Sequence, residues 1–319
     1  MEQGRAQNES AELGGNGHDF RPCQSVNFTV HRVGKQGTKL QELDTPRGLA
    51  CSDTSCFVVD SGNKRIKVYG RRGVMSGLFS SCQTFSVSNS YWDFPTSWSP
   101  QDVAVDSSSA DGDHVVYVTD LKEKVVRKFS HSGVYCGVFS DQMLRSPSNI
   151  AVDPLNGAVI VTDRESRQVA LCKPDGGLIR RFTVPGVPRG VTVSPKTHNI
   201  LVTVEGVSQP AVYTPEGQAI GESQEHENDV LDHKAADLGD LCVDEEGNII
   251  VADRRNSRIL LFDPQRQFVG TLLSRKDGLR DPCGVDLLCD GVVVSDLEQH
   301  CLFYVRPGVA NTSITKPSQ

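Results

Sequence analysis

The sequence lacks the features of membrane-spanning and exported proteins. None of its apolar runs approaches the ~18 residues that a membrane helix needs. Its first twenty residues contain no apolar segment of the kind found in a secretory signal. We therefore expect a protein with no membrane partner and a cytoplasmic location.

An excess of positive charge is also missing. Lys and Arg total 33 and Asp and Glu total 40, which gives a formal net charge of −7. This balance excludes a nucleic-acid binder that relies on bulk charge, and we expect no DNA partner. Any contact with RNA would need a local basic face.

Closely spaced pairs of metal-binding residues are absent as well. The ten cysteines form no C-x-x-C pair, and the spacing of Cys51/Cys56 and of Cys283/Cys289 does not suit a zinc ribbon or knuckle. Cys172 and Cys242 lie inside apolar runs, which indicates buried reduced thiols. The sequence predicts neither a metal site nor a cofactor.

The sequence does contain one motif repeated six times. Each copy has Pro-x-Gly or a variant, a short apolar run, a second apolar run that normally ends in Asp, a polar turn and a third run. The second runs occupy residues 56–60, 116–120, 159–163, 200–203, 249–253 and 292–296. Short β-branched runs separated by Gly, Asn, Asp and Pro predict consecutive β-hairpins.

The spacing of the copies predicts the fold. Successive copies begin 41 to 54 residues apart, close to the roughly 40–50 residues of a four-stranded propeller blade. We therefore expect an all-β protein with a single six-bladed β-propeller over residues 23–306. The strand-like segment at 26–32 would supply the outer strand of the last blade and close the ring. Residues 1–22 and 307–319 are polar and are expected to be disordered tails.

The motif resembles the NHL repeat, particularly that of tripartite-motif NHL proteins. The best matches are residues 251–259 (VADRRNSRI) and 59–66 (VDSGNKRI), and the resemblance covers about residues 26–306. The fourth copy departs furthest, because it has Val204-Glu205 in place of Asp and lacks the Asn/Arg turn. An irregular turn is expected there.

The resemblance implies a propeller that performs no chemistry itself. In that family it binds proteins or RNA, as the recognition part of an E3 ubiquitin ligase or of a translational repressor. This sequence contains no RING, so ligase activity would need another domain or a partner. Whether the chain is part of a longer RING-containing protein is left open.

Antiparallel strands place the loop before the first strand and the turn between the second and third strands on one rim of the ring. Four acidic residues also fall on this rim: Glu123, Glu165, Glu205 and Glu298. Nine basic residues also fall on this rim, which makes it a predicted binding face for an anion or RNA. The same basic residues are equally consistent with solvated turns. Its basic residues are Arg47, Lys64, Lys122, Lys124, Arg164, Arg167, Arg189, Arg254 and Arg255.

Two features favour a protein partner over RNA on this rim. The acidic connection at 222–237 emerges on the same side and would neutralise or cover it. Aromatic residues for base stacking are scarce, at 6% of the chain. RNA binding in post-transcriptional repression remains the alternative.

A second candidate site is the long connection at 85–98. It contains Tyr91, Trp92, Phe94 and Trp98, which are residue types that anchor protein interfaces. The tryptophans are equally suited to folding back over the apolar edge of the second blade.

The paired Asp and Arg residues of the repeat have a mainly structural interpretation. Asp60 with Arg65, and Asp253 with Arg258, are expected to bridge the hairpin turn within a blade. A propeller lyase or lactonase is the least favoured function, because no H-x-H, H-E-x-x-H or G-x-S-x-G motif occurs. We predict no catalytic residues.

Overall fold

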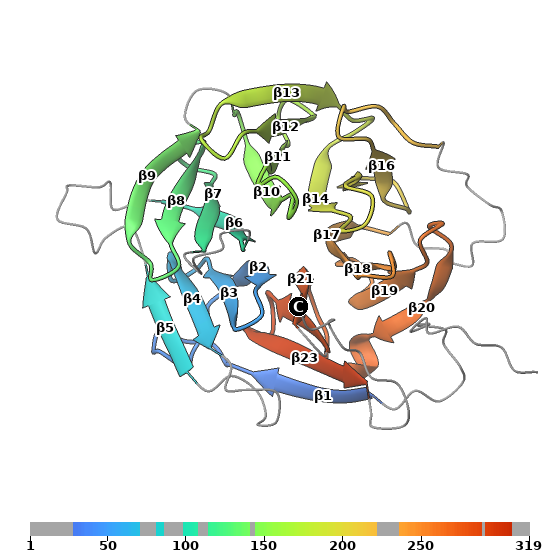
Figure 1. Cartoon of the computed structure of the whole chain (residues 1–319). Helices are drawn as coiled ribbons and strands as arrows, with labels where there is room; N and C mark the ends of the chain where they lie inside the picture. The colour runs from blue at the N-terminus through green and yellow to red at the C-terminus, as the bar shows by residue number, and fades with distance from the viewer. Residues whose placement is uncertain are drawn as a thin grey trace, which may run out of the picture.

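The computed structural model describes residues 28–70, 81–85, 98–107, 114–140, 144–221, 236–288 and 291–307. These residues form six antiparallel sheets arranged in a ring around a central axis, as Figure 1 shows. The predicted all-β six-bladed propeller is confirmed. The predicted tail at 1–22, and residues 308–319 of the other tail, lie outside the described residues.

Each blade begins with its innermost strand and proceeds outwards. Blade one comprises β2 (Pro46–Cys51), β3 (Ser55–Asp60), β4 (Arg65–Gly70) and β5 (Ser81–Phe85). Blade two comprises β6 (Pro100–Asp106), β7 (Val115–Asp120), β8 (Val125–Ser130) and β9 (Tyr135–Ser140). Blade three comprises β10 (Pro147–Val152), β11 (Val159–Asp163), β12 (Gln168–Cys172) and β13 (Leu178–Thr183). Blade four comprises β14 (Pro188–Val193), β15 (Ile200–Val204) and β16 (Ala211–Tyr213). Blade five comprises β17 (Leu238–Val243), β18 (Ile249–Asp253), β19 (Arg258–Phe262) and β20 (Phe268–Leu273). Blade six comprises β21 (Pro282–Leu288), β22 (Gly291–Asp296), β23 (Cys301–Pro307) and β1 (Phe28–Val33). The 3-10 helix η2 (Arg275–Asp277) is one turn long, and within the described ranges no helix is long and apolar enough to span a membrane.

The ring is closed by the N-terminal strand, as predicted. β1 pairs antiparallel with β23, so that Val30 lies opposite Val305, and the sheet order is β1-β23-β22-β21. In Figure 1 this strand runs along the outside of the last blade. Pairing removes the exposed edge that β23 would otherwise present.

Blade four is the irregular one. Three of its strands lie within the described residues, and β16 has only three residues. Val204 occupies the position of the usual buried Asp and is itself buried. Two residues later, Gly206 has a positive φ of 81°. The predicted departure from the repeat is therefore visible in the local structure.

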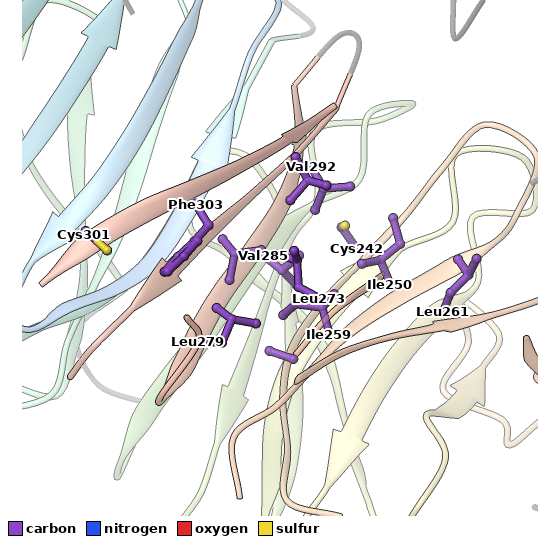
Figure 2. Close-up of a cluster of buried hydrophobic side chains, with 13 residues drawn as sticks. Cys242, Ile250, Ile259, Leu261, Leu273, Leu279, Val285, Val292, Cys301 and Phe303 are labelled. Carbon is purple, nitrogen blue, oxygen red and sulfur yellow. The ribbon is translucent and has the colours of Figure 1, made fainter. Parts of the chain in front are cut away.

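The hydrophobic core lies between neighbouring blades. Along β18, Ile250 and Ala252 pack toward blade six, whereas Ile249 and Val251 pack toward blade four. Figure 2 shows the cluster between blades five and six, where Ile259 of β19 lies near Val285 and Phe303 of blade six. Because successive residues of a strand point to opposite faces, a second strand covered on both faces must be apolar throughout. This explains the unbroken apolar runs of the repeat.

The aspartate that ends most second strands ties two loops together. Asp60 accepts hydrogen bonds from Arg65 Nε at 2.7 Å, from the Asn63 amide at 2.9 Å and from the Asp44 backbone N–H at 2.6 Å. Asp253 likewise accepts from Arg258 Nε at 2.8 Å. Both predicted bridges are present. The contacts join the loop before the first strand to the turn between the second and third strands, which places both on one rim.

A hydroxyl side chain directly before that aspartate, or before Val204 in blade four, links one blade to the next. Thr203 accepts from the Gly190 N–H at 2.7 Å within blade four and donates to the Gly239 carbonyl of blade five at 2.6 Å. Thr119, Thr162 and Ser295 make the equivalent contacts to blades three, four and one. These hydroxyls fix the first strands around the axis, and the repeat analysis did not identify them.

Candidate functional site

The six first strands enclose a narrow axial channel of about 160 Å³. Three aspartates line it, Asp102, Asp240 and Asp286, and the described residues around the channel include no histidine. Each carboxylate accepts a backbone N–H from the following blade, donated by Ile150, Val285 and Cys51 respectively. The aspartates therefore help to hold neighbouring blades together.

Burial disfavours the ionised form of two of these acids. It raises the pKa of Asp102 from 3.8 to about 7, and the backbone N–H of Ile150 partly opposes the shift. Burial also raises the pKa of Asp240 well above its usual value, and the charge of Asp102 adds to this effect. A carboxyl that keeps its proton contributes little negative charge to its surroundings.

At one end of the axis, on the predicted rim, lies a second cavity of about 60 Å³. Four of the nine predicted cations line it, and we call them the arginine cluster: Arg47, Arg164, Arg189 and Arg254. Arg47 and Arg189 are the second residues of β2 and β14, whereas Arg164 and Arg254 directly follow the last residues of β11 and β18. Both positions face the axis, so side chains from four blades meet at one opening.

Half of the arginine cluster is paired with carboxylates. Arg254 donates from Nε and from Nη2 to the two oxygens of Asp281, both at 2.8 Å, and this contact raises the pKa of Arg254. Arg189 lies 3.2 Å from Glu205 and 3.5 Å from Asp237. Asp237 is the last residue of the acidic connection at 222–237, whose residues 222–235 lie outside the described part.

The other half of the cluster is unpaired. Among the described residues, the half-buried side chains of Arg47 and Arg164 have no hydrogen-bond or ion-pair partner, and their buried Nε atoms are unsatisfied. Arg189 Nε is also buried without a partner. Unused donors of this kind from three blades therefore surround one small opening.

The remaining five predicted cations have a different environment. We call them the outer turn cations: Lys64, Lys122, Lys124, Arg167 and Arg255, all of them exposed. Lys64, Lys124 and Arg167 have φ values of 52°, 60° and 56°, because the fourth residue after the aspartate is left-handed in these tight turns. The acidic residues Glu123 and Glu165 are exposed on two of the same turns, and Glu298 is exposed on the corresponding turn of blade six. The nine cations therefore divide into an inner and an outer set.

The aromatic loop divides as well. Trp98 is 5% exposed, packs against Phe129 with 6.1 Å between ring centroids and donates its indole N–H to the Lys64 carbonyl at 2.8 Å. It fills the space between blades one and two, so it is not available as an exposed interface anchor. Tyr91, Trp92 and Phe94 lie outside the described residues.

The thiols fit the reading from sequence. Cys172 and Cys242 are free and buried, and burial raises the pKa of each. The Cys51 and Cys56 thiols, with 2.9 Å between their Sγ atoms, are also free. In the described part of the chain, no group of three or more His, Cys, Asp or Glu residues is placed to hold a metal ion.

Sequence reasoning missed the axial residues. The third residue of each first strand is Gly48, Asp102, Asn149, Gly190, Asp240 and Gly284 in turn. A Cβ on Gly48 would lie 1.7 Å from Asp102 Oδ1, so glycine is required where the neighbouring blade places an acid. This sequence of small and polar residues was the available signal.

Comparisons with known proteins agree with the geometry. The NHL repeat family model matches residues 237–262, which cover the first three strands of blade five. The chain is 25% identical over 306 residues to the E3 ubiquitin-protein ligase TRIM32 of Mus musculus, covering 86% of this chain and 43% of that protein. It is 29% identical over 255 residues to the E3 ubiquitin-protein ligase NHLRC1 of Rattus norvegicus, covering 75% and 60% respectively. The chain thus spans less than two thirds of the length of these curated relatives.

Solved structures show the same fold at low identity. A virginiamycin B lyase from Staphylococcus aureus superimposes with a TM-score of 0.60 at 12% identity, covering 88% of this chain and 99% of that chain. A gluconolactonase from Xanthomonas campestris gives 0.63 at 14%, covering 89% and 99%. These likenesses concern the fold alone, because one propeller architecture hosts unrelated functions. The repeat, the ring and the curated relatives together identify the chain as an NHL-repeat six-bladed β-propeller, distantly related to the ligases TRIM32 and NHLRC1.

Proposed function

We propose that this propeller is a non-catalytic recognition module that binds a protein partner over the face carrying the arginine cluster. In this proposal it recruits substrates to, or scaffolds, a ubiquitin ligase system of the tripartite-motif type. The ligase relatives support that setting. The observation that carries the proposal is the mouth of the channel, where half-buried arginines from four blades converge and two of them lack a partner.

The mixed charge of this face supports a protein partner. Glu205 is 49% exposed beside Arg189, and Asp281 lies beside Arg254. A surface that carries both signs of charge complements a protein better than a polyanion, because each carboxylate repels nearby phosphates.

The experiment is affinity capture by the full chain from a ribonuclease-treated extract, with two matched charge reversals. Arg164→Glu changes the mouth, whereas Arg255→Glu changes an exposed cation on the same rim. We expect a set of proteins retained by the wild type and by Arg255→Glu but lost with Arg164→Glu. Capture that is equal for both variants would contradict the proposal.

RNA binding across the same rim is the second candidate, supported by the nine cations on one face. No aromatic side chain is among the described residues that line the mouth, so base stacking has no platform there. Electrophoretic shift with random single strands and hairpins tests it. Tight binding that weakens steeply with salt and is lost in Arg164→Glu would favour RNA.

A further inference from the structure

The arginine cluster holds donor capacity that the fold does not use. The Nε atoms of Arg47, Arg164 and Arg189 are buried without a hydrogen-bond partner among the described residues. A buried donor that lacks an acceptor is costly, and more so when it is charged. A partner that supplies oxygen atoms at this position would relieve that cost.

The unsatisfied charge is concentrated on two residues. Arg254 is neutralised by Asp281, and Arg189 shares Glu205 and Asp237, whereas Arg47 and Arg164 form no ion pair in the described part. Burial lowers the pKa of Arg164, the charge of Arg189 lowers it further, and Glu205 opposes the shift. The guanidinium is thus held in an environment that favours the arrival of an anion.

The acid beneath the cluster does not fill this role. Asp240 lines both the mouth and the channel, but its oxygens accept from the Asn149 amide at 3.4 Å and from the Val285 N–H at 3.2 Å. Burial also raises its pKa well above the usual value. The mouth therefore carries positive charge above an acid whose ionised form is disfavoured by burial.

The size of the mouth limits what enters. Its volume of about 60 Å³ corresponds to roughly four to six water molecules on a scale that assigns about 10–15 Å³ to each. A phosphate or carboxylate group fits this space. Planar guanidiniums from different blades suit such oxyanions, which accept two hydrogen bonds from one arginine.

We propose that the mouth of the channel is an oxyanion pocket, in which Arg47 and Arg164 bind one phosphate or carboxylate group on the side chain of a peptide. The exposed Glu205 and the paired Asp237 and Asp281 surround the pocket. They disfavour a run of negative charges, so the preferred peptide carries a single anion between neutral or basic residues. This inference deepens the proposed function and rests on it.

The test is calorimetric binding of the full chain to inorganic phosphate and to three short peptides. The peptides share neutral and basic flanks and differ at the central residue, which is phosphoserine, glutamate or serine. We expect binding of phosphate, and at least about tenfold tighter binding of a charged peptide than of the serine peptide, as for charge-assisted hydrogen bonds. The stronger of the two charged peptides identifies the natural group.

Matched variants locate the site. Arg164→Gln and Arg47→Gln should each weaken binding of the charged peptide by about tenfold. Arg255→Gln should change that affinity by less than about twofold, because the Arg255 charge is solvated. Arg164→Lys, which keeps the charge, should retain part of the affinity, and thermal unfolding checks that each variant is folded. Equal binding of the serine peptide, or no effect of Arg164→Gln in a folded protein, would overturn the inference.

Two further outcomes separate this inference from the proposed function. Loss of partner capture in Arg164→Glu without any phosphate or charged-peptide binding would reject the oxyanion pocket and leave protein recognition standing. Binding of an RNA strand that is lost in Arg164→Gln, with no charged-peptide binding, would reject both and assign the mouth to RNA.

Discussion

The arginine cluster and the outer turn cations carry the same charge on the same rim, yet their surroundings differ. Arg164 and Arg167 are three residues apart in one turn. The first is half-buried at the axis, while the second is exposed in a left-handed conformation. The comparison shows that the register of a cation within the repeat decides its environment. Only the positions that face the axis bring charges from several blades together.

The largest expected effect comes from removing Asp253, the buried aspartate directly before Arg254 of the arginine cluster. Asp253→Ala should lower the free energy of unfolding by about 3–5 kcal/mol, because Arg258 and the Asp237 N–H would lose a buried carboxylate. Denaturant unfolding measures this change. The control Arg255→Ala should stay within about 0.5 kcal/mol. Similar changes in unfolding free energy for the two variants would contradict the difference between buried, paired charges and exposed ones.

Trp98 extends the comparison to an aromatic side chain. Trp98→Ala should cost about 3–5 kcal/mol of unfolding free energy, because the indole fills the space between two blades. Denaturant unfolding again provides the readout. A Trp98→Ala protein of unchanged stability that fails to capture its partner would show that the residue is an interface anchor after all.

The inter-blade hydroxyls should have a medium effect. Thr203→Val should cost about 1–3 kcal/mol, because two buried backbone groups, the Gly190 N–H and the Gly239 carbonyl, would lose their partner. Thr271→Val on the exposed outer strand is the matched control. If both variants unfold at the same denaturant concentration, the hydroxyl does not hold the first strands in place.

The last expected effect is a change in the pH dependence of stability. The folded pKa of Asp102 is raised from 3.8 to about 7, so the folded state keeps a proton that the unfolded state releases. The contribution of Asp102 to the stability of the folded state is therefore fully present below about pH 4 and is lost as the pH rises toward 7. Asp102→Asn should flatten the fall in stability across that range, measured by unfolding at several pH values. A steeper slope in Asp102→Asn would reverse the sign of this account.

Much of the fold could be predicted from the sequence, because each blade repeats the same physical requirements. The Asp253–Arg258 bridge, the closing strand and the irregular turn after Val204 all follow from local patterns. The inner and outer cations could not be separated in this way, because Arg254 and Arg255 are adjacent in sequence and only the ring places one of them at the axis. The pairing of Arg254 with Asp281 likewise joins different blades.

The central claim is that Arg47 and Arg164 are anion-binding groups whereas the outer turn cations are solvated. The most direct measurement is a titration of the ¹⁵N-labelled full chain with inorganic phosphate, followed through the arginine Nε–H resonances and assigned with Arg→Lys variants. The account predicts saturable shifts of Arg47 and Arg164 while Arg255 stays unchanged. Equal shifts at Arg164 and Arg255, or no saturable shift at Arg164, would contradict it.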